Sequence, residues 1–127
     1  VDAFKQVNDT YGHDVGDAVL KIIATALKSG LRTPDVIARI GGDEFLVICP
    51  DTSLEAAVAC AERVRRAVEA QSVTTEGLRF KGSISVGVAV RDHSMTNYEA
   101  LIKVADQGVY AAKHRGRNCV AAIQRRD

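Results

Sequence analysis

The apolar residues in the first quarter of the chain repeat with the spacing of a helix. They stand at i, i+3, i+4, i+7 and i+11, so a helix that begins near Asp14 would have one apolar face. Asp14 is a suitable N-cap, and Asp17 stands at the third helical position, where a carboxylate helps to close the first turn. Pro34 ends this section of the chain. The apolar positions are Leu20, Ile23, Ala24, Leu27 and Leu31.

The same spacing predicts two further helices. The second follows a capping box formed by Thr52 and Glu55, and the third extends roughly from Asn97 to His114, with Gly116 as its stop. Their apolar positions are Leu54, Ala57, Val58, Ala61, Val64 and Val68 in the second helix, and Leu101, Val104, Ala105, Val109 and Ala112 in the third.

Short apolar runs rich in β-branched residues predict strands between these helices. Residues 36–40 and 45–49 flank a glycine-rich turn and predict a hairpin. Residues 73–89 predict two more strands with a turn at or near Gly77, and residues 119–123 predict a last strand. Helices interspersed among strands that include hairpins predict an α+β sandwich, with helices packed on a central, largely antiparallel sheet.

Composition and charge restrict the class of protein. A chain of 127 residues with 46% hydrophobic and 26% charged residues is typical of one ordinary globular domain. A formal net charge of +1 gives no support for binding a nucleic-acid polymer or a membrane surface. No apolar run is long enough to span a bilayer and no signal peptide opens the chain, so we expect a cytoplasmic location. The cysteines are odd in number and lie in apolar surroundings, which predicts core residues in a reducing compartment and neither disulfides nor zinc ligands. They are Cys49, Cys60 and Cys119.

The turn of the predicted hairpin carries the most informative polar residues. Gly41 and Gly42 allow positive φ and leave the backbone open to a bulky ligand. The adjacent carboxylates of Asp43 and Glu44 project in different directions, so each can have its own role. The alternative is a surface turn in which both acids are merely solvated.

Four ordered motifs resemble those of the GGDEF family of diguanylate cyclases. Residues 4–17 resemble the family signature FKxxNDxxGHxxGD, and residues 41–45 are Gly-Gly-Asp-Glu-Phe. Residues 83–89 resemble the late strand of the family, and residues 105–118, with their AxxK and GRN motifs, resemble its closing helix. The resemblance therefore covers the whole chain.

The resemblance implies a fold and a reaction. The fold is a palm-like sandwich of the nucleotidyl-cyclase type, related to polymerases. The reaction condenses two GTP molecules into c-di-GMP and pyrophosphate in a homodimer. Mg²⁺ is the implied cofactor, with Mn²⁺ as the alternative, because phosphoryl transfer needs charge neutralisation and positioning. The implied catalytic residues are Asp43 and Glu44, and these carboxylates and the backbone carbonyl of Val1 are the implied metal ligands.

The chain begins where the pattern predicts the end of a strand, at residues 1–5. Family members have an earlier helix and the body of the first strand before this point, and an Asp metal ligand directly before the position of Val1. We therefore expect residues 1–127 to be a single GGDEF domain that lacks its N-terminal helix and the start of its first strand. Such a chain is expected to bind c-di-GMP but to turn over GTP weakly or not at all.

Asn8 and Asp17 correspond to the residues with which the family recognises guanine. A carboxylate can accept from the N1–H and the amino group of the base, and an amide can pair with its acceptors. The alternatives are helix capping for Asp17 and a local backbone contact for Asn8. His13 lies between them and contacts ligand in the family, with local packing at the helix entry as its alternative.

Five further positions correspond to groups that bind substrate in the family. Lys5, Lys113 and Arg117 match cations that hold the triphosphate, while Gly41 and Gly42 match the glycines that face it. For Lys113 and Arg117 the alternative is a favourable interaction of a cation with a helix C-terminus.

An RxxD motif precedes the hairpin at the spacing found in the family. Arg32 and Asp35 correspond to the inhibitory site at which the c-di-GMP product holds the enzyme inactive, and Arg63 corresponds to a second contributor. An Arg fork suits phosphate or the Hoogsteen edge of guanine, and a carboxylate suits the guanine donors. The alternatives are an ordinary helix end followed by a turn, and a solvated arginine on a helix face.

Two other functions compete with the cyclase. A catalytically inactive module that binds GTP or c-di-GMP is the first, although such members usually lose a glycine or carboxylate that this hairpin retains. A related cyclase that uses ATP is the second, and Asp17 disfavours it. The sequence does not identify an upstream sensory domain, an activating signal or a downstream phosphodiesterase domain.

Overall fold

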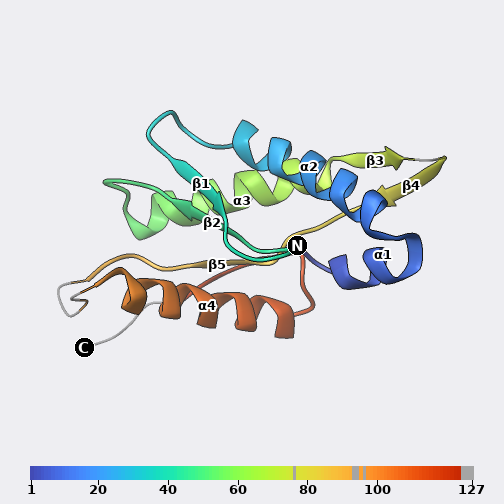
Figure 1. Cartoon of the computed structure of the whole chain (residues 1–127). Coiled ribbons are helices and arrows are strands. Elements are labelled where there is room, and N and C mark those ends of the chain that lie inside the picture. The colour runs from blue at the N-terminus through green and yellow to red at the C-terminus, as the bar shows by residue number, and fades with distance from the viewer. Residues whose placement is uncertain (76, 93–94, 96, 124–127) are drawn as a thin grey trace.

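The helices predicted from apolar spacing are present, together with one that was not predicted. The computed structural model describes residues 1–75, 77–92, 95 and 97–123, and Figure 1 shows their arrangement. The helices are α1 (Phe4–Tyr11), α2 (His13–Ser29), α3 (Leu54–Glu69) and α4 (Tyr98–His114), and the strands are β1 (Val36–Arg39), β2 (Phe45–Ile48), β3 (Ser72–Thr75), β4 (Leu78–Lys81), β5 (Val86–Val88) and β6 (Val120–Ala122). Within these residues no helix is long and apolar enough to cross a membrane.

The start of the chain differs from the prediction. Residues 1–5 were predicted to end a strand, but a helix begins at Phe4, whose side chain is buried. Gly12, with φ 90°, turns the chain directly from α1 into α2 and is the N-cap of α2. The predicted capping roles of Asp14 and Asp17 are therefore wrong. Because Gly12 is the N-cap and α2 begins at His13, both aspartates lie inside the helix.

The strands form three two-stranded ladders that are separate within the described residues. β1 pairs with β2 and β3 pairs with β4, both antiparallel, whereas β5 pairs with β6 in parallel. α4 lies between β5 and β6 in the chain and supplies the crossover that a parallel pair requires. The predicted antiparallel hairpins are thus confirmed, and the parallel pair is an addition.

The segment predicted as two strands contains three. β4 ends at Lys81 and β5 begins at Val86, because the residues between them bond to the start of the chain. The backbone N–H of Asp2 donates to the carbonyl of Ser83 at 2.9 Å, and the hydroxyls of Ser83 and Ser85 donate to its carboxylate. The N-terminus is thereby fixed beside β5.

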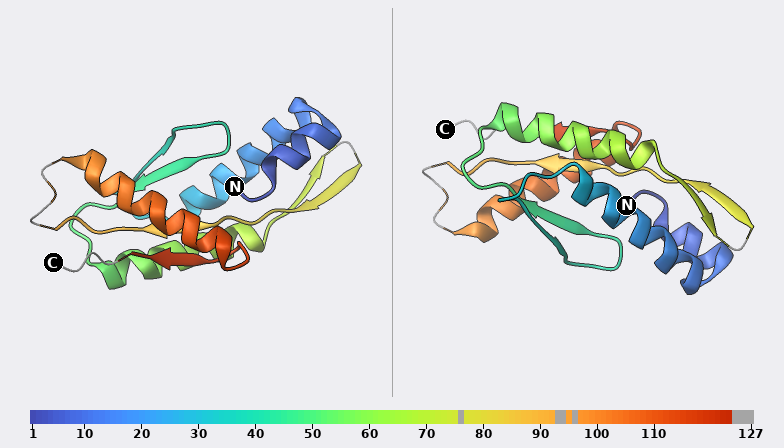
Figure 2. Two further views of the ribbon diagram at one scale, coloured as in Figure 1. Left: turned by 90° about the horizontal axis from the view of Figure 1, so that it is seen from below. Right: turned by 90° about the horizontal axis from the view of Figure 1, so that it is seen from above.

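The apolar core lies between α2, α3 and β5, and α4 covers the other side of β5 (Figure 1). Gly87 and Gly108 allow α4 to approach closely, since a Cβ on Gly87 would lie 2.0 Å from the carbonyl oxygen of Ala105. This packing places the C-terminal end of α4 close to the N-terminus of the chain (Figure 2). The buried core residues are Val15, Val19, Ile23, Ala26, Leu27, Val64, Val68 and Ile84.

Candidate functional site

The tip of the β1–β2 hairpin is a loop that joins Ile40 to Glu44. The backbone N–H of Ile40 donates to the carbonyl of Glu44 at 3.0 Å and closes the loop. Gly41 and Gly42 do not use the positive φ that glycine allows, because the glycines with positive φ are Gly12, Gly77 and Gly116. A loop of this length turns without left-handed residues. The second predicted role is supported, since a Cβ on Gly42 would have nothing within 4 Å.

Arg39 fixes the backbone of this turn, and the sequence analysis missed it. Its Nε donates to the carbonyl of Gly41 at 3.1 Å, and its Nη2 donates to the carbonyl of Gly42 at 2.7 Å. Both peptide groups are therefore oriented by a single guanidinium. In the sequence, a cation two residues before a pair of glycines could have indicated this contact.

The N-terminus and the hairpin tip meet. The ammonium of Val1 donates to the carbonyl of Asp43 at 2.9 Å. The pKa of this ammonium is below its ordinary value, first because burial disfavours its charge and also because Lys113 repels it, while Asp43, Asp2 and Glu44 oppose the shift. Residues from three distant parts of the chain therefore act on one another here, as Figure 2 also shows for the N-terminus, the hairpin and the end of α4.

Asp2 is a second residue that the sequence analysis missed. Its carboxylate accepts from Ser83 Oγ at 2.7 Å, from Ser85 Oγ at 2.6 Å and from the backbone N–H of Asn118 at 3.1 Å. Burial acts to raise the pKa of Asp2, but the bonds from Ser85, Ser83 and Asn118 outweigh it and hold the pKa below its ordinary value. Two serines at i and i+2, which face the same side of an extended chain, were the available signal.

The predicted base-recognition residues lie on α1 and α2. Asn8 packs directly on Gly16, because a Cβ at Gly16 would lie 1.7 Å from Asn8 Oδ1. That oxygen is buried without a hydrogen-bond partner among the described residues. Asp17 and His13 are exposed on α2. The structure thus brings Asn8 to the residue before Asp17 and leaves a polar atom unpaired there.

The predicted triphosphate cations are separated along the chain. Lys113 is exposed in the last turn of α4 and acts electrostatically on the Val1 ammonium. Arg117 is exposed with φ 66°, and its backbone N–H donates to the carbonyl of Ala112 at 3.0 Å. Lys5 is exposed on α1. Lys113 therefore lies near the Val1 ammonium, whereas Lys5 and Arg117 face solvent.

The RxxD motif forms a tight turn after α2. The guanidinium of Arg32 bonds to Asp35 with an Nη2–Oδ1 distance of 3.2 Å, and its backbone N–H donates to Asp35 Oδ2 at 2.9 Å. The pKa of Asp35 is held below its ordinary range, chiefly by the bonds from the backbone and the side chain of Arg32. Arg32 Nη2 also donates to Thr52 Oγ1 at 2.8 Å.

Arg63 reaches the same place from α3. Its Nε donates to the carbonyl of Gly30, at the C-terminus of α2, at 2.8 Å. The structure therefore brings Arg63 beside Arg32, although about thirty residues separate them in the chain. All three residues of the predicted inhibitory site gather where α2 ends.

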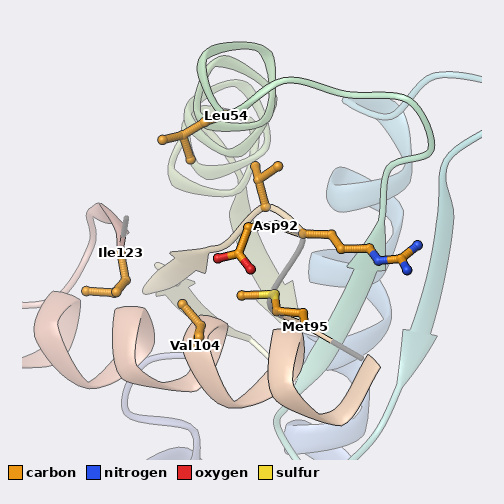
Figure 3. Close-up of a pocket in the computed structure, with 7 residues that line it drawn as sticks. Leu54, Asp92, Met95, Val104 and Ile123 are labelled. Carbon is orange, nitrogen blue, oxygen red and sulfur yellow. The ribbon is translucent and has the colours of Figure 1, made fainter. Parts of the chain in front are cut away.

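An apolar pocket of about 190 Å³ lies at another part of the molecule. Figure 3 shows its lining, which comes from α3, α4 and the segments after β5 and β6. The charged and polar groups suited to nucleotide chemistry lie at the hairpin tip instead, so we place the candidate site there. The lining residues are Leu54, Val90, Arg91, Asp92, Met95, Val104 and Ile123.

Comparison with known proteins defines the class. The family model described as "Diguanylate cyclase, GGDEF domain" matches residues 1–119. The chain therefore belongs to the GGDEF diguanylate cyclase family, and the predicted resemblance is confirmed.

Individual relatives agree with this assignment. The chain is 42% identical over 120 residues to diguanylate cyclase A of Treponema denticola, and 46% identical over 122 residues to the response regulator PleD of Caulobacter vibrioides. Each alignment covers 94% of this chain but 32% and 27% of the respective relative. The chain thus spans about a third or less of the length of these proteins.

Solved structures confirm the fold. The diguanylate cyclase SiaD of Pseudomonas aeruginosa, in complex with its activator SiaC, gives a TM-score of 0.91 at 41% identity over 97% of this chain and 47% of that chain. The GGDEF domain of DgcB from Caulobacter crescentus, in complex with c-di-GMP, gives 0.87 at 32% identity over 95% of this chain and 70% of that chain. The predicted α+β palm-like fold is therefore confirmed.

Proposed function

We propose that this chain is the catalytic domain of a diguanylate cyclase, which condenses two GTP molecules into c-di-GMP as a homodimer. In each of two steps a ribose 3′-hydroxyl attacks an α-phosphorus, its proton leaves, and pyrophosphate departs. One observation carries the proposal. In a chain of this family, the intact Gly41–Phe45 hairpin meets the start of the chain and the end of α4, which brings together the groups that such a transfer needs.

The oxygen groups at the hairpin tip fit a magnesium ion. The carboxylates of Asp43 and Glu44 and the carbonyl of Val1 would hold it, since Mg²⁺ prefers oxygen ligands and few protein carboxylates. The hydrogen bond between Val1 and Asp43 supports this donor set, because it brings the two backbones together. When bound, the ion neutralises charge that develops on the phosphate oxygens. Mn²⁺ takes the same ligands.

The chain's own residues bind and orient the substrate. We assign Glu44 as the base that takes the proton of the 3′-hydroxyl, and Asp43 as the carboxylate that fixes the metal. The open face of Gly42 would admit the triphosphate to the backbone, with Gly41 next to the Glu44 carboxylate, and Lys113 would act as a counter-charge near Val1. Lys5 and Arg117 complete the cationic set.

We assign base recognition to Asn8 and Asp17, with His13 at the same helix entry. The buried and unpaired Asn8 Oδ1 supports a ligand there, because such an atom is costly until it has a partner. The carboxylate of Asp17 would accept from the guanine N1–H and amino groups. Since GTP is a cytoplasmic nucleotide, we place the domain in the cytoplasm.

We also propose that c-di-GMP binds at Arg32, Asp35 and Arg63 and inhibits turnover. The support is geometric, because the two guanidiniums and the carboxylate gather at the end of α2. In the structure these groups bond to one another and to the Gly30 carbonyl. Product binding would exchange those bonds for bonds to phosphate and guanine.

The test is synthesis of c-di-GMP by the protein that contains this domain. Glu44→Gln keeps the size of the side chain but loses its charge, so we expect unchanged folding and at least a hundredfold slower synthesis. Glu55→Gln, in an exposed carboxylate at the start of α3, is the matched control and should leave the rate unchanged. If Glu44→Gln synthesised c-di-GMP as fast as this control, the catalytic assignment would be wrong. A wild type that binds GTP without turnover would be a binding module instead.

A further inference from the structure

A cluster of two thiols and a carboxylate lies beside the RxxD turn. The ligand atoms of Asp35, Cys49 and Cys60 all lie within 4.8 Å of one another. Asp35 comes from the turn after α2, Cys49 follows β2, and Cys60 lies on α3. From the sequence we predicted that the cysteines are core residues and neither disulfides nor zinc ligands, and no sequence pattern showed that these two would meet. We call these three residues the thiol–carboxylate cluster.

The cluster is half-buried, and its residues come from three separate segments of the chain. The Asp35 side chain has 0% exposure, and Cys60 is 8% exposed. Cys49 and Cys60 are free thiols. The guanidinium of Arg32 covers Asp35 at 50% exposure and interacts electrostatically with both cysteines. A small ion would therefore meet three ligand atoms that already lie close together, with Arg32 beside them.

The ligand chemistry selects the ion. Thiolates together with one carboxylate suit zinc and exclude magnesium, which prefers oxygen. In tetrahedral zinc sites with Zn–S distances of about 2.3 Å, ligand atoms lie about 3.8 Å apart, so the cluster needs to contract by no more than about 1 Å. Two thiolates and a carboxylate around a divalent cation leave one negative charge, which Arg32 can balance. Water would take the fourth position, as in open zinc sites.

We propose that Asp35, Cys49 and Cys60 bind a zinc-type divalent cation, and that the bound cation weakens c-di-GMP binding at the RxxD motif. The second half rests on the proposed function, because it requires that Arg32 and Asp35 bind the product. Asp35 accepts bonds from the backbone N–H, Nε and Nη2 of Arg32. A cation that takes one oxygen of this carboxylate removes it as an acceptor for guanine. The cation and the product therefore compete for Asp35.

The thiols have to lose protons when the cation binds. Burial, followed by the charge of Asp35 and the neighbouring Cys60, raises the pKa of Cys49 to about 11. The thiol is thus protonated before binding, and each thiol that ligates the cation releases one proton to solvent. No electron transfer is involved.

The first experiment measures the cation alone. The full chain, kept reduced with a phosphine, is titrated with Co²⁺ and then Zn²⁺, and thiolate-to-cobalt absorption is followed. We expect one equivalent of Co²⁺ in the wild type and in Cys119→Ser, the control at a cysteine outside the cluster, with displacement by Zn²⁺. Binding should weaken at least tenfold in Cys49→Ser and Cys60→Ser. Because Cys60 is buried and its variant could unfold, Asp35→Asn is measured as well, with the same expectation.

Three results would overturn the cation site. One is equal binding in Cys49→Ser and Cys119→Ser. Another is the absence of thiolate absorption in the wild type. The third is a wild type that binds no cation and forms only a Cys49–Cys60 disulfide, which mass spectrometry detects as the loss of two hydrogens.

The second experiment measures the coupling by calorimetric titration of c-di-GMP. Wild type loaded with Zn²⁺ should bind at least tenfold more weakly than metal-free wild type, and Cys49→Ser should show no such difference. Equal affinity in chains shown to hold Zn²⁺ would overturn the coupling. If metal-free wild type binds no c-di-GMP, the inhibitory-site assignment fails and the coupling fails with it, while the Co²⁺ titration still decides the cation site.

Discussion

At the scale of single residues, Arg39 links strand β1 to the geometry of the hairpin tip. It bonds to the carbonyls of both turn glycines, so the peptide groups that face the proposed triphosphate have a fixed orientation. Arg39→Ala should lower the rate of c-di-GMP synthesis by about 10- to 100-fold, because small misplacements of reacting groups are costly. The free energy of unfolding should fall by no more than about 1 kcal/mol, because both bonds are exposed.

Arg39→Lys is the informative comparison for this prediction. A single ammonium cannot bond to two carbonyls with the geometry of a guanidinium fork, so we expect intermediate activity. Initial rates and urea unfolding on the three proteins separate the two effects. A drop in stability that accounts for the whole loss of activity would show that Arg39 is merely a structural residue.

Asp2 offers a test by pH. Its folded-state pKa is below the ordinary value of 3.8, so its stabilising bonds are fully present above that pH and are lost as the pH falls through the folded-state pKa. Asp2→Asn should lower the free energy of unfolding by about 1–2 kcal/mol at pH 7, and the difference from wild type should shrink under acid conditions. Urea unfolding from pH 7 to pH 3 measures this.

The control for Asp2 is Asp106→Asn, at an exposed carboxylate of α4. This variant should follow the wild type at every pH. A difference between Asp2→Asn and wild type that stays constant down to pH 3 would contradict the ionic origin of the bonds.

At the scale of elements, two neighbouring hydroxyl residues at the start of α3 have different roles. Thr52 was predicted to cap the helix, but the Oγ of Ser53 accepts from the N–H of Ala56 at 3.2 Å, and Ser53 is the N-cap. Thr52 bonds instead to Arg32 and to the Pro50 carbonyl. Ser53→Ala should therefore destabilise the protein by about 0.5–2 kcal/mol. Thermal unfolding of Ser53→Ala beside Thr52→Ala is the measurement, and a larger loss for Thr52→Ala would restore the original capping box.

Periodic elements were predictable, and elements defined by distant contacts were not. α2, α3 and α4 each carry an apolar stripe that only a helix can bury, so their existence follows from the sequence. α1 has a single buried residue, Phe4, and depends on α2 for its packing. The break before β5 depends on Asp2, more than eighty residues earlier in the chain. No local pattern contains such information.

The candidate site divides in the same way. The family resemblance indicated Asp43, Glu44 and the RxxD residues as candidate site residues. The structure adds that Asp43 contacts Val1 and that Arg32 contacts Asp35. Arg39, Asp2 and the thiol–carboxylate cluster escaped notice because each acts through a partner on another element. The spacing between Cys49 and Cys60 in the sequence matches no metal-binding motif, because a turn and part of α3 lie between them.

At the scale of the whole molecule, α2 links the two regions to which we assign substrate and product. The core lies between α2, α3 and β5, and α4 covers the other side of β5. α2 begins near the proposed base-recognition residues and ends at the RxxD turn, so one helix spans both of the proposed regions. If c-di-GMP binds at the RxxD turn as proposed, it does so at the opposite end of α2 from the proposed base-recognition residues.

This arrangement leads to a prediction about concentration. On the proposed function, each domain binds one GTP and c-di-GMP forms when two domains face each other, so the initial rate should follow the amount of dimer. At concentrations below the dimer dissociation constant, the specific activity should rise in proportion to protein concentration, because the dimer then scales with its square. Arg32→Ala is the variant to use, since it should remove the proposed product inhibition, which would otherwise lower rates at high concentration. Light scattering over the same dilution series locates the monomer range, and a constant specific activity across that range would show that one domain alone completes the reaction.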